Sequence, residues 1–120
     1  YAPEKYEYPI NRYAMEVKRQ LDVLDKLLFD KNFICCEKYT IADISIWSWY
    51  GALVLGRLYN AGEFLDVKIY KNVLRWAKVI NNRQAVKRGI MVNKIKGNPS
   101  SQLHERHSSS DFIHKTQDKL

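Results

Sequence analysis

Apolar residues recur at helical spacing through the first quarter of the chain. Six of them follow one another at intervals of four, three, four, three and four positions: Ile10, Ala14, Val17, Leu21, Leu24 and Leu28. This spacing lines one face of an α-helix, while charged residues such as Glu16 and Arg19 occupy the remaining positions. Pro9 falls in the first turn, where its missing N–H costs no hydrogen bond. The pattern predicts a long amphipathic helix over residues 7–30.

A second helix is predicted to begin at the string Thr40-Ile41-Ala42-Asp43. The string has the form of a capping box, in which the Thr40 hydroxyl accepts from the N–H of Asp43 and the Asp43 carboxylate accepts from the N–H of Thr40. From residue 41 to residue 58 apolar side chains fall on every side, which is typical of a helix at the centre of a bundle. We interpret Trp47, Trp49 and Tyr50 as core residues, and the alternative is that they line an apolar substrate pocket.

Two shorter helices are predicted after the break at Ala61-Gly62, over residues 68–80 and 84–92. The polar, Gly- and Pro-containing stretch at 96–101 ends the compact part of the chain. Neither a strand pattern nor an internal repeat is visible in the sequence. We therefore predict an all-α helical bundle over residues 1–95 with an extended polar tail over residues 96–120.

Composition narrows the class of protein only a little. The 120 residues are 46% hydrophobic and 12% aromatic, as expected for a folded globular domain. The net charge of +7 is spread out, so it permits an anionic ligand or a nucleic acid without selecting either. The longest apolar region, residues 44–55, is too short to span a bilayer. The first residue is Tyr1 and not Met, from which we expect further sequence upstream.

Three groups of residues invite a chemical interpretation that the spacing does not support. Cys35 and Cys36 are adjacent, which suits a structural disulfide poorly, and we expect two reduced thiols in a cytosolic protein; the alternative is a redox-active pair. His104 and His107 are three residues apart, whereas the zinc motif H-E-x-x-H needs four, so no metal site is predicted. The capping role of Asp43 explains that residue better than a catalytic role.

The capping string and the segments around it carry a family resemblance. Thr40-Ile41-Ala42-Asp43 resembles the string that opens the central helix in the C-terminal domains of cytosolic glutathione transferases. Residues 70–76 and 82–89 are similar to the next helices of those domains. Further stretches resemble the bacterial nu class of the family, a subgroup of disulfide-bond oxidoreductases: residues 1–3, 7–12, 21–26 and 102–107. The resemblance runs through nearly the whole chain.

The resemblance implies an activity and a ligand. Proteins of this subgroup bind two glutathione molecules per subunit and reduce small disulfides with the thiols of glutathione. A thioredoxin-like domain activates these thiols, and this sequence does not contain it. An arginine early in the long helix, matched here by Arg12, pairs with a carboxylate of the second glutathione, and Tyr1 matches a tyrosine near the same pocket. The alternative is that Arg12 is a solvated helix residue paired with Tyr8 or Glu16. No catalytic residue is expected within this chain.

The resemblance also implies partners and a location. We expect glutathione as co-substrate without a metal, a homodimer in the full-length protein, a cytoplasmic location, and neither a membrane nor a nucleic acid partner. The isolated 120-residue piece is expected to be inactive. Two alternatives remain open: a non-catalytic helical docking module, as in translation factors and tRNA synthetases, and an inactive truncated product.

Two positions depart from the family pattern. Cys35-Cys36 stands where the family has a small or Gly-containing turn, and Gly there permits a positive φ. Gln84 stands where a proline usually opens the last short helix, which should weaken the start of that helix slightly.

Overall fold

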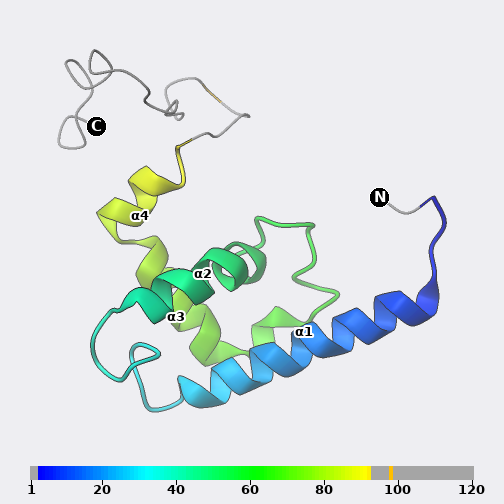
Figure 1. The fold of residues 1–120 in the computed structure, drawn as a ribbon, viewed down its shortest axis with the longest axis horizontal. Coiled ribbons are helices and arrows are strands. Elements are labelled where there is room, and N and C mark those ends of the chain that lie inside the picture. The colour runs from blue at the N-terminus through cyan, green and yellow to red at the C-terminus, as the bar shows by residue number, and fades with distance from the viewer. Residues whose placement is uncertain (1–2, 93–97, 99–120) are drawn as a thin grey trace. The chain divides into compact units, whose positions relative to one another are not determined.

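The computed structural model describes residues 3–92 and residue 98. Its elements follow the order α1 (Glu7–Leu27), α2 (Ile41–Val54), the 3₁₀ helix η1 (Val67–Ile69), α3 (Lys71–Asn81) and α4 (Gln84–Gly89) (Figure 1). The described residues contain no strand beyond one isolated bridge between Phe33 and Cys36. The all-α prediction is confirmed. The described chain divides into two units after residue 80, and the helices α1 and α2 lie in the first, together with α3 up to Ile80.

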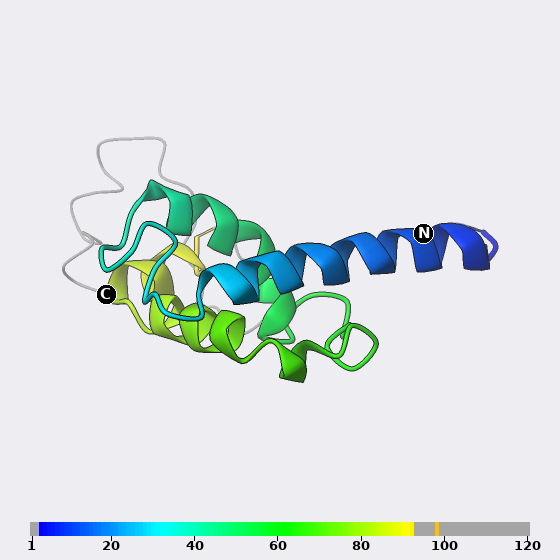
Figure 2. The same ribbon diagram turned by 90° about the horizontal axis from the view of Figure 1, so that it is seen from below.

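The long helix α1 is buried only in its second half. Leu21 and Leu24 are buried within it, and Leu28 directly after it is also buried, whereas Ile10 near its start is 43% exposed. Figure 2 shows the first turns of α1 extending past α2 and α3. The predicted apolar face of this helix is therefore the face that packs on the rest of the unit. Within residues 3–80, no other element covers its N-terminal part.

Helix α3 contributes more buried apolar residues to the core of the described chain than any other helix. Val73, Trp76 and Ala77 have no exposed surface. Its N-terminus is capped from α1, because the Asp25 carboxylate accepts from the backbone N–H groups of Asn72 at 2.8 Å and of Val73 at 3.0 Å. A side-chain oxygen on an orphan helix donor stabilises the helix and fixes its contact with α1.

The C-terminal end of α1 is held in turn by a cation from α3. The Arg75 guanidinium donates to the carbonyl of Leu28 at 2.8 Å and to that of Lys31 at 2.7 Å. A positive charge near the last carbonyls of a helix also suits the helix dipole. The two helices thus cap each other.

Helix α2 does not lie at the centre of the first unit, contrary to the prediction from its composition. Asp43, Gly51 and Val54 are its buried residues, while Ile41 is 83% and Trp49 is 75% exposed. Hydrogen bonds join α2 to α1 through Tyr50 and to α3 through Trp47, and several side chains at its other positions stay exposed. Its composition, apolar on all sides, leaves apolar side chains facing outward.

Helix ends fall short of the predicted bounds where the backbone turns. Helix α2 ends at Val54, not at residue 58, and Gly56 follows with φ of 74°. The predicted third helix divides into η1 and α3, and α4 ends at Gly89, not at residue 92. In the turn before α2, Cys36 has a φ of 70°, so it adopts the left-handed backbone that a glycine would hold at lower cost.

Candidate functional site

Asp43 is a buried acceptor at the start of α2. Both halves of the capping box with Thr40 are present, and Asp43 Oδ2 accepts from the Thr40 N–H at 2.9 Å. The other oxygen, Oδ1, accepts from the N–H of Ile34 at 3.0 Å and from the indole N–H of Trp76 at 2.9 Å. One carboxylate therefore joins the preceding loop, α2 and α3.

The hydrogen bonds also decide the protonation state of Asp43. Burial on its own raises the pKa of this carboxyl group, but the donors from Ile34, Trp76 and Thr40 outweigh that effect and leave the pKa below its ordinary value. A carboxylate that is ionised, buried and fully occupied by donors has no proton to give and no free lone pair turned to solvent. Its role is to anchor the fold.

Arg12 lies in the exposed first half of α1. Within the described residues its guanidinium makes no hydrogen bond and no ion pair, although Glu16 one turn further on is close enough for their charges to interact. An unpaired guanidinium offers parallel N–H donors that suit a carboxylate. Tyr1, the other residue expected near the same pocket, lies outside the described residues.

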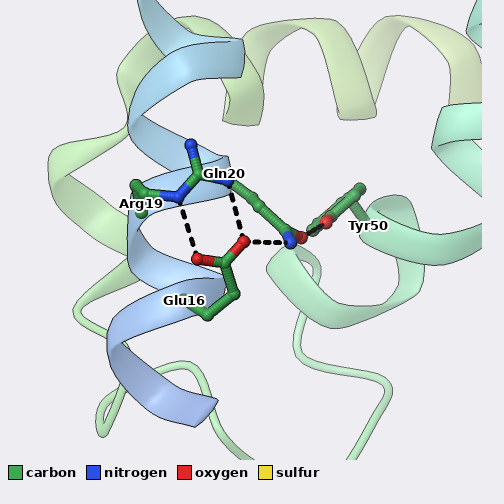
Figure 3. Close-up of polar contacts among 4 residues, drawn as sticks. All are labelled: Glu16, Arg19, Gln20 and Tyr50. Atoms are coloured by element: carbon green, nitrogen blue, oxygen red, sulfur yellow. Dashed lines mark hydrogen bonds and ion pairs between the residues drawn. The ribbon is translucent and has the colours of Figure 1, made fainter. Parts of the chain in front are cut away.

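A chain of polar contacts follows Arg12 along α1 and crosses to α2 (Figure 3). The Arg19 guanidinium donates from Nε to Glu16 Oε2 and from Nη2 to Glu16 Oε1, each at 2.8 Å. Gln20 Nε2 donates to Glu16 Oε1 at 2.8 Å, and Gln20 Oε1 accepts from the hydroxyl of Tyr50 on α2. Hydrogen bonds from Arg19 first and Gln20 second lower the pKa of Glu16 to about 2.

The aromatic residues of α2 do not act as a group. Trp47 is partly buried and donates its indole N–H to the carbonyl of Ala77 at 3.1 Å, while the guanidinium of Arg57 lies 5.5 Å from the centroid of its ring. Tyr50 is partly buried, and burial is the main reason why its pKa is raised. Trp49 is mostly exposed, so these three side chains do not enclose an apolar pocket together.

The thiols and imidazoles give no metal site within residues 3–92. Cys35 and Cys36 are exposed free thiols, and no cluster of three potential metal ligands occurs in the described part of the chain. His104 and His107 lie outside it. No helix among the described residues is long and apolar enough to cross a membrane.

Residues 7–78 match the family described as the glutathione S-transferase C-terminal domain. The chain belongs to this family, as its capping string and helix order indicated. It is 56% identical to the disulfide-bond oxidoreductase YghU of Escherichia coli over 99% of its own length and 41% of that protein. It is also 55% identical to a GST-like protein of Streptococcus mutans over 78% of its length and 36% of that protein.

Solved structures agree with the sequence comparison. The glutathione transferase YghU of Streptococcus pneumoniae, whose crystal structure is a complex with glutathione, matches with a TM-score of 0.74 and 53% identity. The match covers 88% of this chain and 38% of that one. The chain thus spans well under half the length of the relatives that it matches.

The contacts among Glu16, Arg19 and Gln20 were not predicted from the sequence, although their spacing indicates part of them. Their spacing of three and four residues places them on one side of a helix, where such side chains meet. The contact of Gln20 with Tyr50 carries no sequence signal, because the two residues are 30 positions apart and meet only when α2 packs on α1.

Proposed function

We propose that this chain is the helical part of a glutathione-dependent disulfide-bond oxidoreductase, and that it supplies binding groups for glutathione. The observation that carries the proposal is the similarity to an oxidoreductase of that name along 99% of the chain. The glutathione complex of the pneumococcal relative supports glutathione as the ligand. Thiol activation belongs, on this proposal, to residues that this chain does not contain.

Arg12 is the residue that we propose to bind a carboxylate of glutathione. It is exposed, it has no partner among the described side chains, and glutathione carries two carboxylates that suit a guanidinium. Tyr1 is proposed to lie near the same pocket. The carboxylate would take two parallel N–H bonds from Arg12, which orients the ligand as well as attracting it.

We also propose a homodimer in the cytoplasm for the full-length protein, with small disulfides as the second substrate. The exposed apolar side chains on α1 and α2, such as Tyr13, Ile41 and Trp49, are consistent with surfaces that further protein covers. A metal has no place in this proposal, because the chemistry is thiol–disulfide exchange by glutathione itself.

Replacing Arg12 tests the proposal. In the protein that carries this chain, Arg12→Ala should weaken glutathione binding by about 1.5–3 kcal/mol, the usual scale for hydrogen bonds between charged groups. Arg12→Lys keeps the charge but cannot form two parallel hydrogen bonds with a carboxylate. Its affinity for glutathione should therefore lie between those of the wild type and of Arg12→Ala. Lys38→Ala removes the same charge from an exposed position in the loop before α2 and serves as the control. Isothermal calorimetry that finds unchanged affinity in Arg12→Ala would contradict the role of Arg12.

A further inference from the structure

Arg12 and Glu16 are placed to form an ion pair that does not form. They are four residues apart on α1, and oppositely charged side chains at this spacing are neighbours on a helix surface. The pair is absent because the Glu16 carboxylate faces the next turn of the helix. Both of its oxygens accept from Arg19, and one of them also accepts from Gln20 (Figure 3).

We propose that Arg19 is a positioning residue, which holds Glu16 away from Arg12 and so keeps the Arg12 guanidinium available to an anionic ligand. The inference rests on the proposed function, in which that ligand is a carboxylate of glutathione. Two cations, Arg12 and Arg19, flank one acidic side chain. Because the acid binds the second cation through two parallel hydrogen bonds, the first is left without a partner.

The arrangement is fixed from a second direction by α2. The amide of Gln20 has one orientation that satisfies both of its neighbours, with its nitrogen toward Glu16 and its oxygen toward the hydroxyl of Tyr50. Tyr50 is partly buried, so its hydroxyl is a fixed point while Arg19 is exposed. Two residues of α1 therefore hold the carboxylate of Glu16. Gln20 also contacts Tyr50 on α2, whereas Arg19 hydrogen-bonds only with Glu16 in this group.

Protonation does not release Glu16 under ordinary conditions. The hydrogen bond from Arg19 is the largest reason for its low pKa and Gln20 is the next, while the charge of Arg12 contributes least. The carboxylate stays ionised at neutral pH and competes for a cation at all times. Arg19 decides which cation the carboxylate pairs with: with Arg19 present, Glu16 pairs with Arg19 and not with Arg12.

Loss of Arg19 should therefore weaken ligand binding indirectly. In Arg19→Ala, Gln20 still holds one oxygen of Glu16, but the other oxygen loses its donor. The carboxylate can then approach Arg12, where its negative charge competes with the ligand carboxylate. Exposed pairs at this spacing are weak, so we expect glutathione to bind about two- to three-fold less tightly. Glu16→Gln removes the competing charge, so the double variant Arg19→Ala/Glu16→Gln should bind glutathione as tightly as Glu16→Gln alone.

Calorimetric titration with glutathione, in the full protein that carries this chain, separates the possible results. Wild type, Arg12→Ala, Arg19→Ala, Glu16→Gln and the double variant are compared at low and at high salt. The expected loss in Arg19→Ala shrinks at high salt, because Arg12 is exposed and Glu16 is partly exposed, so that salt screens their charges; the loss disappears when Glu16 is neutral. Far-UV circular dichroism checks that each variant is folded, as the exposure of Arg19 leads us to expect.

Each remaining outcome has one meaning. If Arg12→Ala loses affinity and Arg19→Ala does not, Arg12 binds the ligand without help, and the positioning role is wrong while the proposed function stands. If Arg19→Ala loses affinity and Glu16→Gln does not restore it, Arg19 acts by direct contact or through the fold, which also overturns the inference. If Arg12→Ala binds glutathione like the wild type, the proposed ligand role of Arg12 fails first.

Discussion

Replacing Asp43 by alanine should remove a large share of the stability of this fold. The substitution leaves three N–H groups without their acceptor: the indole of Trp76, which has no exposed surface, and the backbone groups of Ile34 and Thr40, which are partly buried. A buried donor without a partner costs about 1–3 kcal/mol, and the loss of a helix cap costs about 1 kcal/mol. We expect Asp43→Ala to lower the free energy of unfolding by about 3–5 kcal/mol.

A milder change at the same position keeps the experiment interpretable if the alanine variant does not fold. Asp43→Asn has the same shape and can still offer one oxygen to Ile34 and Trp76, but its NH₂ group would face the N–H of Thr40. We expect it to cost about 1–3 kcal/mol. The stability of a domain is ~5–15 kcal/mol, so either loss is large enough to measure.

Urea denaturation followed by circular dichroism at 222 nm gives the free energies without relying on tryptophan fluorescence. Trp76→Phe, made alone and together with Asp43→Ala, completes a double-mutant cycle for the buried contact, because both substitutions remove the hydrogen bond between the indole and the carboxylate. A positive coupling of about 1 kcal/mol or more is expected for a hydrogen bond to a charged group. A cost below ~1 kcal/mol for Asp43→Ala would refute the reasoning, because it would mean that water satisfies these donors as well as the carboxylate does.

Two further predictions concern packing on α2 and acid stability. A Cβ at Gly51 would lie 2.5 Å from ring atoms of Trp47, so Gly51→Ala should shift the Trp47 ring and lower the free energy of unfolding in urea by about 1–3 kcal/mol; a variant as stable as wild type would contradict this. The folded-state pKa of Asp43 is depressed, so its contribution to stability is present above the unfolded pKa of about 4 and is lost as pH falls through the lower folded value. The urea midpoint should therefore decline below about pH 4, and the gap between wild type and Asp43→Asn should narrow there; a constant gap down to pH 2 would argue against the depressed pKa.

Local signals in the sequence predicted where the helices lie and the hydrogen bonding between Asp43 and Thr40 that caps α2. The four-three spacing from Ile10 to Leu28 indicated α1, and the Thr40–Asp43 spacing indicated the cap of α2. Both rest on interactions between residues three or four positions apart, which any helix brings together. For the same reason, the pairing of Glu16 with Arg19 follows from local geometry once the helix is granted.

Contacts between distant residues were decided only by the tertiary structure. Nothing local shows that the second oxygen of Asp43 meets Trp76, 33 positions away, or that Gln20 meets Tyr50. The composition of α2 indicated a buried helix, but burial depends on how neighbouring elements pack around it, and Ile41 and Trp49 on this helix are exposed. The sequence by itself thus determined where the helices lie and how α2 is capped, because those interactions are short in range, whereas the caps that α1 and α3 give each other are contacts between distant residues. Which of those side chains are buried, and which residues of α2 meet α1 and α3, depended on the packing of helices against one another.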